Sequence, residues 1–350
     1  MLYPFRKGVF LAKIAVELEQ ALKRRALSGA PRNTVARRLA EGNGWTVSDV
    51  VCTSGPQDRP FEERYSHVCI AIVTAGSFQY RSSVGRELLT PGSLLLGNAG
   101  QYFECGHEHG VGDRCLSFSY EPQYFAGLAT EAGAQSRSAR FSKLRVPPVR
   151  ELSSLVARAC VGLAECGDTA QGRGQSAFAV ETEKPARNSL EHASSSNAGM
   201  TMWEEIGIEL AVRALDFASG GEPNRGSLPA AEARVTRIVR MIEGHPNSDH
   251  GLGALAREAK LSRYHFLRIF QQLTGLTPHQ YVRRTRLRRV ATRLVLEPAR
   301  VLDIALDSGF GDVSNFNHAF RAEFGVSPRS YRRNACHSTR REDAPGLVET

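Results

Sequence analysis

Hydrophobic positions in the first part of the chain follow the pattern of short strands. Between residues 45 and 120, runs rich in β-branched and aromatic residues alternate with turn residues. The predicted strands are Val47–Cys52, His67–Thr74, Ser77–Ser82, Gly92–Gly97, Gln101–Glu104 and Arg114–Tyr120. Strands this short and closely spaced favour a small β-sandwich or barrel, and His67–Thr74 is apolar on both faces, as in a strand that is covered on each side.

The first 44 residues combine a helical period with an arginine-rich stretch. Apolar residues recur at four-residue steps from Phe10 through Ile14 and Leu18 to Leu22, and arginines with Pro31 follow. We interpret this segment as a poorly ordered N-terminal extension. A nucleic-acid-binding arm or an interaction helix is the alternative.

Two amphipathic helices are predicted after the β region, at Val149–Ala164 and Met202–Ser219. Residues 167–199 between them are rich in Gly, Ser and Glu and lack an apolar period, which predicts a flexible insert. The second helix carries an apolar stripe of Ile206, Leu210 and Leu215. The stripe has two open interpretations, a contact in a dimer or a cover for the sheet.

From Arg234 to Arg333 the pattern is helical throughout and contains an internal repeat. The residues Phe266, Phe270, Gly275, Pro278 and Tyr281 recur 50 positions later as Phe316, Phe320, Gly325, Pro328 and Tyr331. In each copy a helix is followed by a turn and a second helix, which Ser262 or Asp312 can cap. The repeated glycines can end these second helices. The repeat therefore predicts two helix-turn-helix units.

An arginine-rich helix over His279–Leu296 connects the two units. At 1.5 Å per residue it is about 27 Å long, so it can hold two recognition helices in successive major grooves about 34 Å apart. Residues 232–333 contain 18 Lys and Arg against 9 Asp and Glu and thus carry the whole net charge of +9. Positive charge confined to one domain favours a nucleic-acid partner.

Residues 234–333 resemble the DNA-binding domain of the AraC/XylS family of bacterial transcription regulators. The string GFGDVSNFNHAFRAEFGVSPRSYRR, which begins at Gly309, is similar to the family signature around the second recognition helix. The resemblance implies a seven-helix domain that binds double-stranded promoter DNA, more often as an activator than as a repressor. RNA polymerase is the expected protein partner of such a regulator.

The resemblance, carried over by position, assigns DNA contacts to both units. In the first unit the base-reading candidates are Arg263, Tyr264, Leu267 and Arg268, with Gln271 toward the backbone. In the second unit they are Ser314, Asn315, Asn317 and His318, with Arg321 at a phosphate. Leu267 and His318 depart from the family, which more often has longer polar or basic residues there.

The β region resembles, more loosely, the cupin-like effector domain of the same family. Gly92 and Gly100 fit the second cupin motif, but Phe103 stands at the position of the metal-binding histidine. This substitution argues against a cupin metalloenzyme.

A nearby cluster offers thiol and imidazole donors from Cys105, His107, His109 and Cys115. Because glycines make this segment a turn, we expect an effector-sensing or structural loop with no bound metal and no cofactor. A cupin-type metal-binding enzyme or metal sensor is the alternative function.

These patterns predict an α+β multidomain protein, with an N-terminal cupin-like β-barrel or sandwich covered by helices and a C-terminal all-α domain with two helix-turn-helix units. The expected domains are an effector domain (45–130), a helical dimerisation and linker region (131–231), the DNA-binding domain (232–333) and a tail (334–350). A small effector, whose binding residues the sequence does not identify, and a homodimer are expected.

Several absences also shape the prediction. The sequence has no GxSxG, Walker A or HExxH motif, so we expect no enzyme. It has no uninterrupted run of about 20 apolar residues and no secretory signal, so we expect a cytoplasmic protein without membrane contact. The seven cysteines are scattered without a CxxC pair and are interpreted as reduced thiols.

Overall fold

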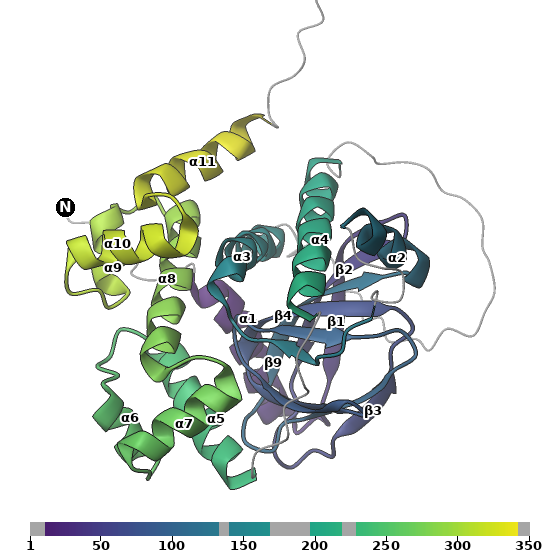
Figure 1. Cartoon of the computed structure of the whole chain (residues 1–350), viewed down its shortest axis with the longest axis horizontal. Helices are drawn as coiled ribbons and strands as arrows, with labels where there is room; N and C mark the ends of the chain where they lie inside the picture. Colours follow the sequence, from purple (N-terminus) through teal and green to yellow (C-terminus); the bar gives the residue numbers. More distant parts are fainter. Residues whose placement is uncertain (1–10, 133–139, 169–196, 219–228, 342–350) are drawn as a thin grey trace, which may run out of the picture.

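The computed structural model describes residues 11–132, 140–168, 197–218 and 229–341. It consists of a β region covered by helices, followed by an all-helical C-terminal region (Figure 1). The predicted α+β class is confirmed.

The β region is built from two antiparallel sheets. The six-stranded sheet has the order β1 (Thr34–Gly42), β2 (Trp45–Cys52), β9 (Asp113–Tyr120), β4 (Val68–Gly76), β7 (Leu94–Gly97) and β10 (Arg145–Val146). The four-stranded sheet has the order β3 (Phe61–Arg64), β8 (Tyr102–Gly106), β5 (Phe78–Ser82) and β6 (Gly85–Leu89). All six predicted strands are present. The pattern missed β1, β3, β6 and β10; β1 lies at the sheet edge with no buried side chain, which leaves no apolar alternation.

The central strand β4 separates two hydrophobic cores. Its residues Cys69, Ala71 and Val73 are buried together with side chains from the four-stranded sheet. Ile70 and Ile72 point the other way, into a core shared with the covering helices. The strand is thus covered on each side, as its continuous apolar run predicts.

Three helices cover the six-stranded sheet, namely α2 (Pro122–Glu131), α3 (Ser153–Asp168) and α4 (Asn197–Ala218). A 3₁₀ turn at Arg150–Leu152 precedes α3. The apolar stripe of α4 is buried in this core, so it covers the sheet and is not free for a second subunit. Most of the predicted flexible insert, residues 169–196, lies outside the described residues.

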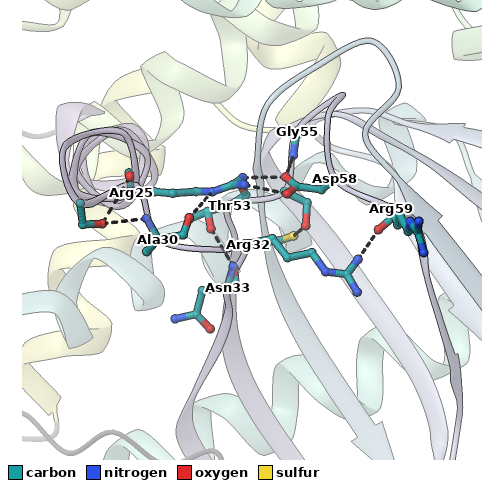
Figure 2. A network of polar contacts seen from close by, with 11 residues as sticks. Arg25, Ala30, Arg32, Asn33, Thr53, Gly55, Asp58 and Arg59 are labelled. Atoms are coloured by element: carbon teal, nitrogen blue, oxygen red, sulfur yellow. Dashed lines mark hydrogen bonds and ion pairs between the residues drawn. The ribbon is translucent and has the colours of Figure 1, made fainter.

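The N-terminal segment differs from the predicted poorly ordered extension. It contains helix α1 (Leu11–Ser28) and the edge strand β1. Arg25 of α1 donates two hydrogen bonds of 2.7 Å to the carboxylate of Asp58, and the Asn33 amide donates to the Thr53 hydroxyl at 3.0 Å (Figure 2). The Arg25 hydrogen bond lowers the pKa of Asp58. These partners are distant in the sequence, so the helical period alone did not indicate that the segment is docked.

The C-terminal region comprises α5 (Pro229–Gly244), α6 (Leu252–Glu258), α7 (Arg263–Thr274), α8 (Pro278–Leu296), α9 (Val301–Asp307), α10 (Val313–Phe324) and α11 (Pro328–Arg341). Figure 1 shows α8 running between the α5–α7 group and the α9–α10 group. Each group has its own aromatic core. The two predicted helix-turn-helix units and the connecting helix are therefore confirmed.

Polar contacts join the β region to the helical region. Arg145 Nη1 donates to the carbonyl of Thr274 at the end of α7 (3.0 Å), and Arg284 Nη1 of α8 donates to the carbonyl of Pro148 (2.5 Å). Among the described residues, no helix is both long and apolar enough to cross a membrane.

Candidate nucleic-acid interface

The internal sequence repeat produces the same aromatic packing in both units. Phe266 and Phe270 lie 5.4 Å apart between ring centroids, and Phe316 and Phe320 lie 5.7 Å apart. Each second phenylalanine meets the repeated tyrosine edge-on at 83°, Phe270 with Tyr281 at 5.7 Å and Phe320 with Tyr331 at 5.5 Å. All four phenylalanines are fully buried, so one face of α7 and of α10 is committed to the core.

Both recognition helices begin and end at the predicted caps. The Ser262 hydroxyl accepts a hydrogen bond from the His265 amide, and the Asp312 carboxylate accepts from the Ser314 and Asn315 amides. Gly275 and Gly325 end the helices in the left-handed conformation, with φ of 78° and 77°. The first and last residues of each recognition helix are thus set by local sequence.

The turn inside each unit places one residue in the left-handed region. In the first unit this residue is Lys260 (φ 54°), and in the second it is Gly309 (φ 89°). A Cβ atom on Gly309 would lie 2.7 Å from the Cα atom of Asn247. Glycine is therefore required on both steric and backbone grounds in the second unit only.

Gly309→Ala is expected to lower the free energy of unfolding by about 1–3 kcal/mol, because it adds backbone strain and a clash with the main chain. Lys260→Gly, the matched change in the other unit, relieves strain and should alter stability by no more than about 1 kcal/mol. Urea unfolding followed by circular dichroism measures both. Equal destabilisation by the two variants would contradict this account of the turns.

The residues assigned to DNA contact lie on the outer faces of α7 and α10. Tyr264 is 77% exposed, so its ring is accessible from solvent. Leu267 is half-buried, and the others are exposed: Arg263, Arg268, Gln271, Ser314, Asn315, Asn317, His318 and Arg321. The structure thus brings together, on the free face of each recognition helix, the residues that the sequence assigned to that helix.

Most arginines of α8 are engaged within the protein. Arg284 pairs with Glu323 (3.1 Å), Arg288 with Glu243 (2.9 Å) and Arg293 with Glu297 (2.9 Å), while Arg289 donates to the Glu243 carbonyl (2.8 Å). Burial lowers the pKa of Arg284 and Arg289. Arg283, by contrast, is exposed. The net positive charge of this helix therefore overstates how many of its arginines can reach a phosphate.

Arg286 joins the two units through backbone carbonyls. Its guanidinium donates to the carbonyls of Pro246 (2.7 Å) and Ser248 (3.0 Å) in the first unit and of Gly309 (2.8 Å) in the second. This contact holds the turn of the second unit against the first. No feature of the sequence distinguished Arg286 from its neighbours, because carbonyl acceptors leave no signature in the residue pattern.

The two histidines of the cluster considered for metal binding have different neighbours in the structure. His107 is buried and lies beside Asp113, whereas His109 lies near Glu108, with 3.8 Å between Nε2 and Oε2. Burial disfavours the charged imidazole, but the hydrogen bonds and charge interactions with Asp113 and Cys52 together outweigh it and raise the pKa of His107 to about 9. Phe103, at the position of the cupin histidine, stacks on Tyr65 at 4.2 Å.

This geometry defines the C-terminal region as a double helix-turn-helix domain, and comparisons with known proteins agree. Residues 255–334 match the model of a helix-turn-helix domain family. The regulator MtrA of Neisseria gonorrhoeae is 30% identical over 102 residues, which cover 29% of this chain and 34% of that protein. The transcriptional activator RhaS of Escherichia coli (strain SE11) is 35% identical over 106 residues, 30% of this chain and 38% of that protein.

Among solved structures, the DNA-binding domain of AdpA in complex with a target DNA is 28% identical, with a TM-score of 0.29, and covers 32% of this chain and 98% of that one. The chain spans about a third of the length of the curated relatives it matches. The C-terminal region is a helix-turn-helix domain similar to regions of the transcription regulators MtrA and RhaS, in agreement with the resemblance found in the sequence.

Proposed function

We propose that this protein is a sequence-specific transcription regulator that binds promoter DNA through both helix-turn-helix units. One observation carries the proposal: two capped helices in one chain each bury an aromatic face and leave a polar face exposed. A helix presented in this way fits the major groove of B-form DNA. The curated relatives that match this region include transcriptional regulators.

We assign base reading to Arg263, Tyr264, Leu267 and Arg268 in α7 and to Ser314, Asn315, Asn317 and His318 in α10. Gln271 and Arg321 contact the DNA backbone in this proposal. The exposed positions of these residues on the recognition helices support it. The regulator acts as an activator with RNA polymerase as its partner and has no catalytic role.

Arg268→Ala is expected to cost about 1–3 kcal/mol of binding free energy on the cognate site and much less on random DNA, because a bidentate guanine contact is lost. Arg321→Ala should weaken binding to both DNAs alike, because it removes a phosphate contact. Fluorescence anisotropy with labelled duplexes at one salt concentration measures both effects.

The matched control is Arg38→Ala, which removes an exposed arginine of β1 that pairs with Glu41. It should leave both affinities unchanged. If Arg268→Ala and Arg321→Ala lower both affinities equally, the assigned base and phosphate roles are wrong. If none of the three variants changes DNA affinity, the proposed DNA-binding face is wrong.

We also propose control by a small effector and action as a homodimer. A cavity of about 720 Å³ between α1, α5 and α8 supports effector binding. Its lining combines Arg240, Arg288 and Arg289 with the acids Glu19 and Glu243, so it offers a ligand polar groups of both signs. The buried stripe of α4 does not support dimerisation, so the homodimer rests on the family resemblance. Solution mass and thermal-shift measurements with carboxylate and phosphate metabolites test the two proposals.

The assignment of domains along the chain is also part of this proposal. Residues 45–130 form the effector domain, residues 131–231 the helical linker region and residues 232–333 the DNA-binding domain. The docking of α1 and β1 on β2 adds the preceding segment to the effector domain.

A further inference from the structure

Three side chains with metal-binding chemistry meet at one end of the six-stranded sheet. Cys52 is the last residue of β2, Asp113 is the first of β9, and the register places them opposite each other. His107 reaches the same point from the loop between β8 and β9. One potential ligand atom from each of the three lies within 4.8 Å of the other two, and all three residues are buried. His107 Nε2 and Asp113 Oδ2 are 2.6 Å apart.

We propose that Cys52, His107 and Asp113 form a binding site for a divalent cation of the zinc class. A thiolate, an imidazole and a carboxylate are donors that zinc accepts in tetrahedral sites, whereas calcium and magnesium select oxygen ligands alone. Binding displaces the thiol proton of Cys52 and the proton held between His107 and Asp113, and both leave to solvent. This proposal replaces our expectation from the sequence that no metal binds.

A second thiol lies beside Asp113. The thiol of Cys115 donates a hydrogen bond to Asp113 Oδ1 at 3.4 Å, so Cys115 contacts the carboxylate of a proposed ligand. Cys115 is not among the residues whose ligand atoms all lie within 4.8 Å of one another, so a water molecule is the fourth ligand in this proposal.

The surroundings orient the proposed ligands. The Cys52 thiol donates to the Ser54 hydroxyl at 3.3 Å, and the ring of Phe78 stacks on His107 at 5.9 Å. The Nδ1 atom of His107 is buried with no hydrogen-bond partner among the described residues. An ion pair between His107 and Asp113 alone leaves the Nδ1 atom of His107 without a partner.

The site is independent of the proposed DNA-binding function and is distinct from the cupin motif. The cupin position falls on Phe103, whose ring is occupied by stacking on Tyr65, so the donors come from other positions. The sequence had suggested Cys105, His107, His109 and Cys115, which are close in the chain. Cys52 is 55 residues away from His107 and joins it only through strand pairing.

Titration of the full-length, reduced protein with Co²⁺ tests the proposal. The expected result is one equivalent bound with a thiolate-to-cobalt charge-transfer band and the intense visible absorption of four-coordinate cobalt, both removed by competing Zn²⁺. This measurement uses the unmodified protein and therefore does not depend on whether a variant folds. Its absence at stoichiometric Co²⁺ would overturn the proposal and leave a structural ion pair.

Cys52→Ala should remove or greatly weaken the charge-transfer band and lower Co²⁺ affinity at least about tenfold. The matched control is Cys69→Ala, which removes another buried thiol that contacts a serine hydroxyl, that of Ser117 at 3.4 Å. It should leave both unchanged. His107→Gln provides a second ligand variant, and circular dichroism verifies folding of each protein. Equal Co²⁺ affinity in the Cys52 and Cys69 variants would show that the three residues do not bind the cation.

Discussion

Phe320→Ala is expected to lower the free energy of unfolding by about 3–5 kcal/mol and to abolish DNA reading by the second unit. The ring of Phe320 is fully buried and contacts Phe316, Phe324 and Tyr331 at 4.5–5.7 Å between centroids. Removing it leaves a cavity between α10 and α11, because neighbouring rings on rigid helices collapse only in part. Urea unfolding monitored by circular dichroism gives the size of the effect.

The internal repeat supplies the matched comparison. Phe270→Ala removes the equivalent ring from the first unit, which is also fully buried, and should cost a similar amount. Tyr264→Ala removes an aromatic side chain that is 77% exposed and should change stability by no more than about 0.5 kcal/mol. A small loss for Phe320→Ala, comparable with that for Tyr264→Ala, would mean that the aromatic cluster does not hold the unit together.

Raising the salt concentration from about 50 to 200 mM is expected to weaken duplex binding by about 10²–10³-fold. The estimate assumes about four to six phosphate contacts, each contributing about −0.9 to the slope of log K against log salt through counterion release. Exposed arginines on and beside the recognition helices, such as Arg283 and Arg321, can supply such contacts. Affinity measured at five or more salt concentrations gives the slope.

Substitutions of two arginines of α8 distinguish the effect of a direct phosphate contact from the effect of the net charge of the protein. Arg283 is exposed, so Arg283→Ala should make the slope shallower by about 0.9. Arg289 donates to the Glu243 carbonyl within the protein, so Arg289→Ala should leave the slope unchanged even though it removes the same formal charge. Equal changes in slope for both variants would indicate that net charge, not specific contact, governs binding.

The sequence by itself determined the parts of this protein that depend on local order. Helix caps act over three residues and aromatic faces repeat over four, so Ser262, Asp312 and the repeated phenylalanines were enough to predict both helix-turn-helix units. The same reasoning predicted six strands of the β region from their apolar runs and the outward face of each recognition helix.

Only the tertiary structure decided which distant groups meet. Strand register brings Cys52 to Asp113, and chain reversal brings Arg286 to the carbonyl of Gly309. It also shows that Arg25 secures the N-terminal helix through Asp58, where the local pattern predicted a loose extension. Such pairings depend on sheet register and helix packing across tens of residues, where short-range periodicity carries no information, and a single ion pair or thiol leaves no periodic trace.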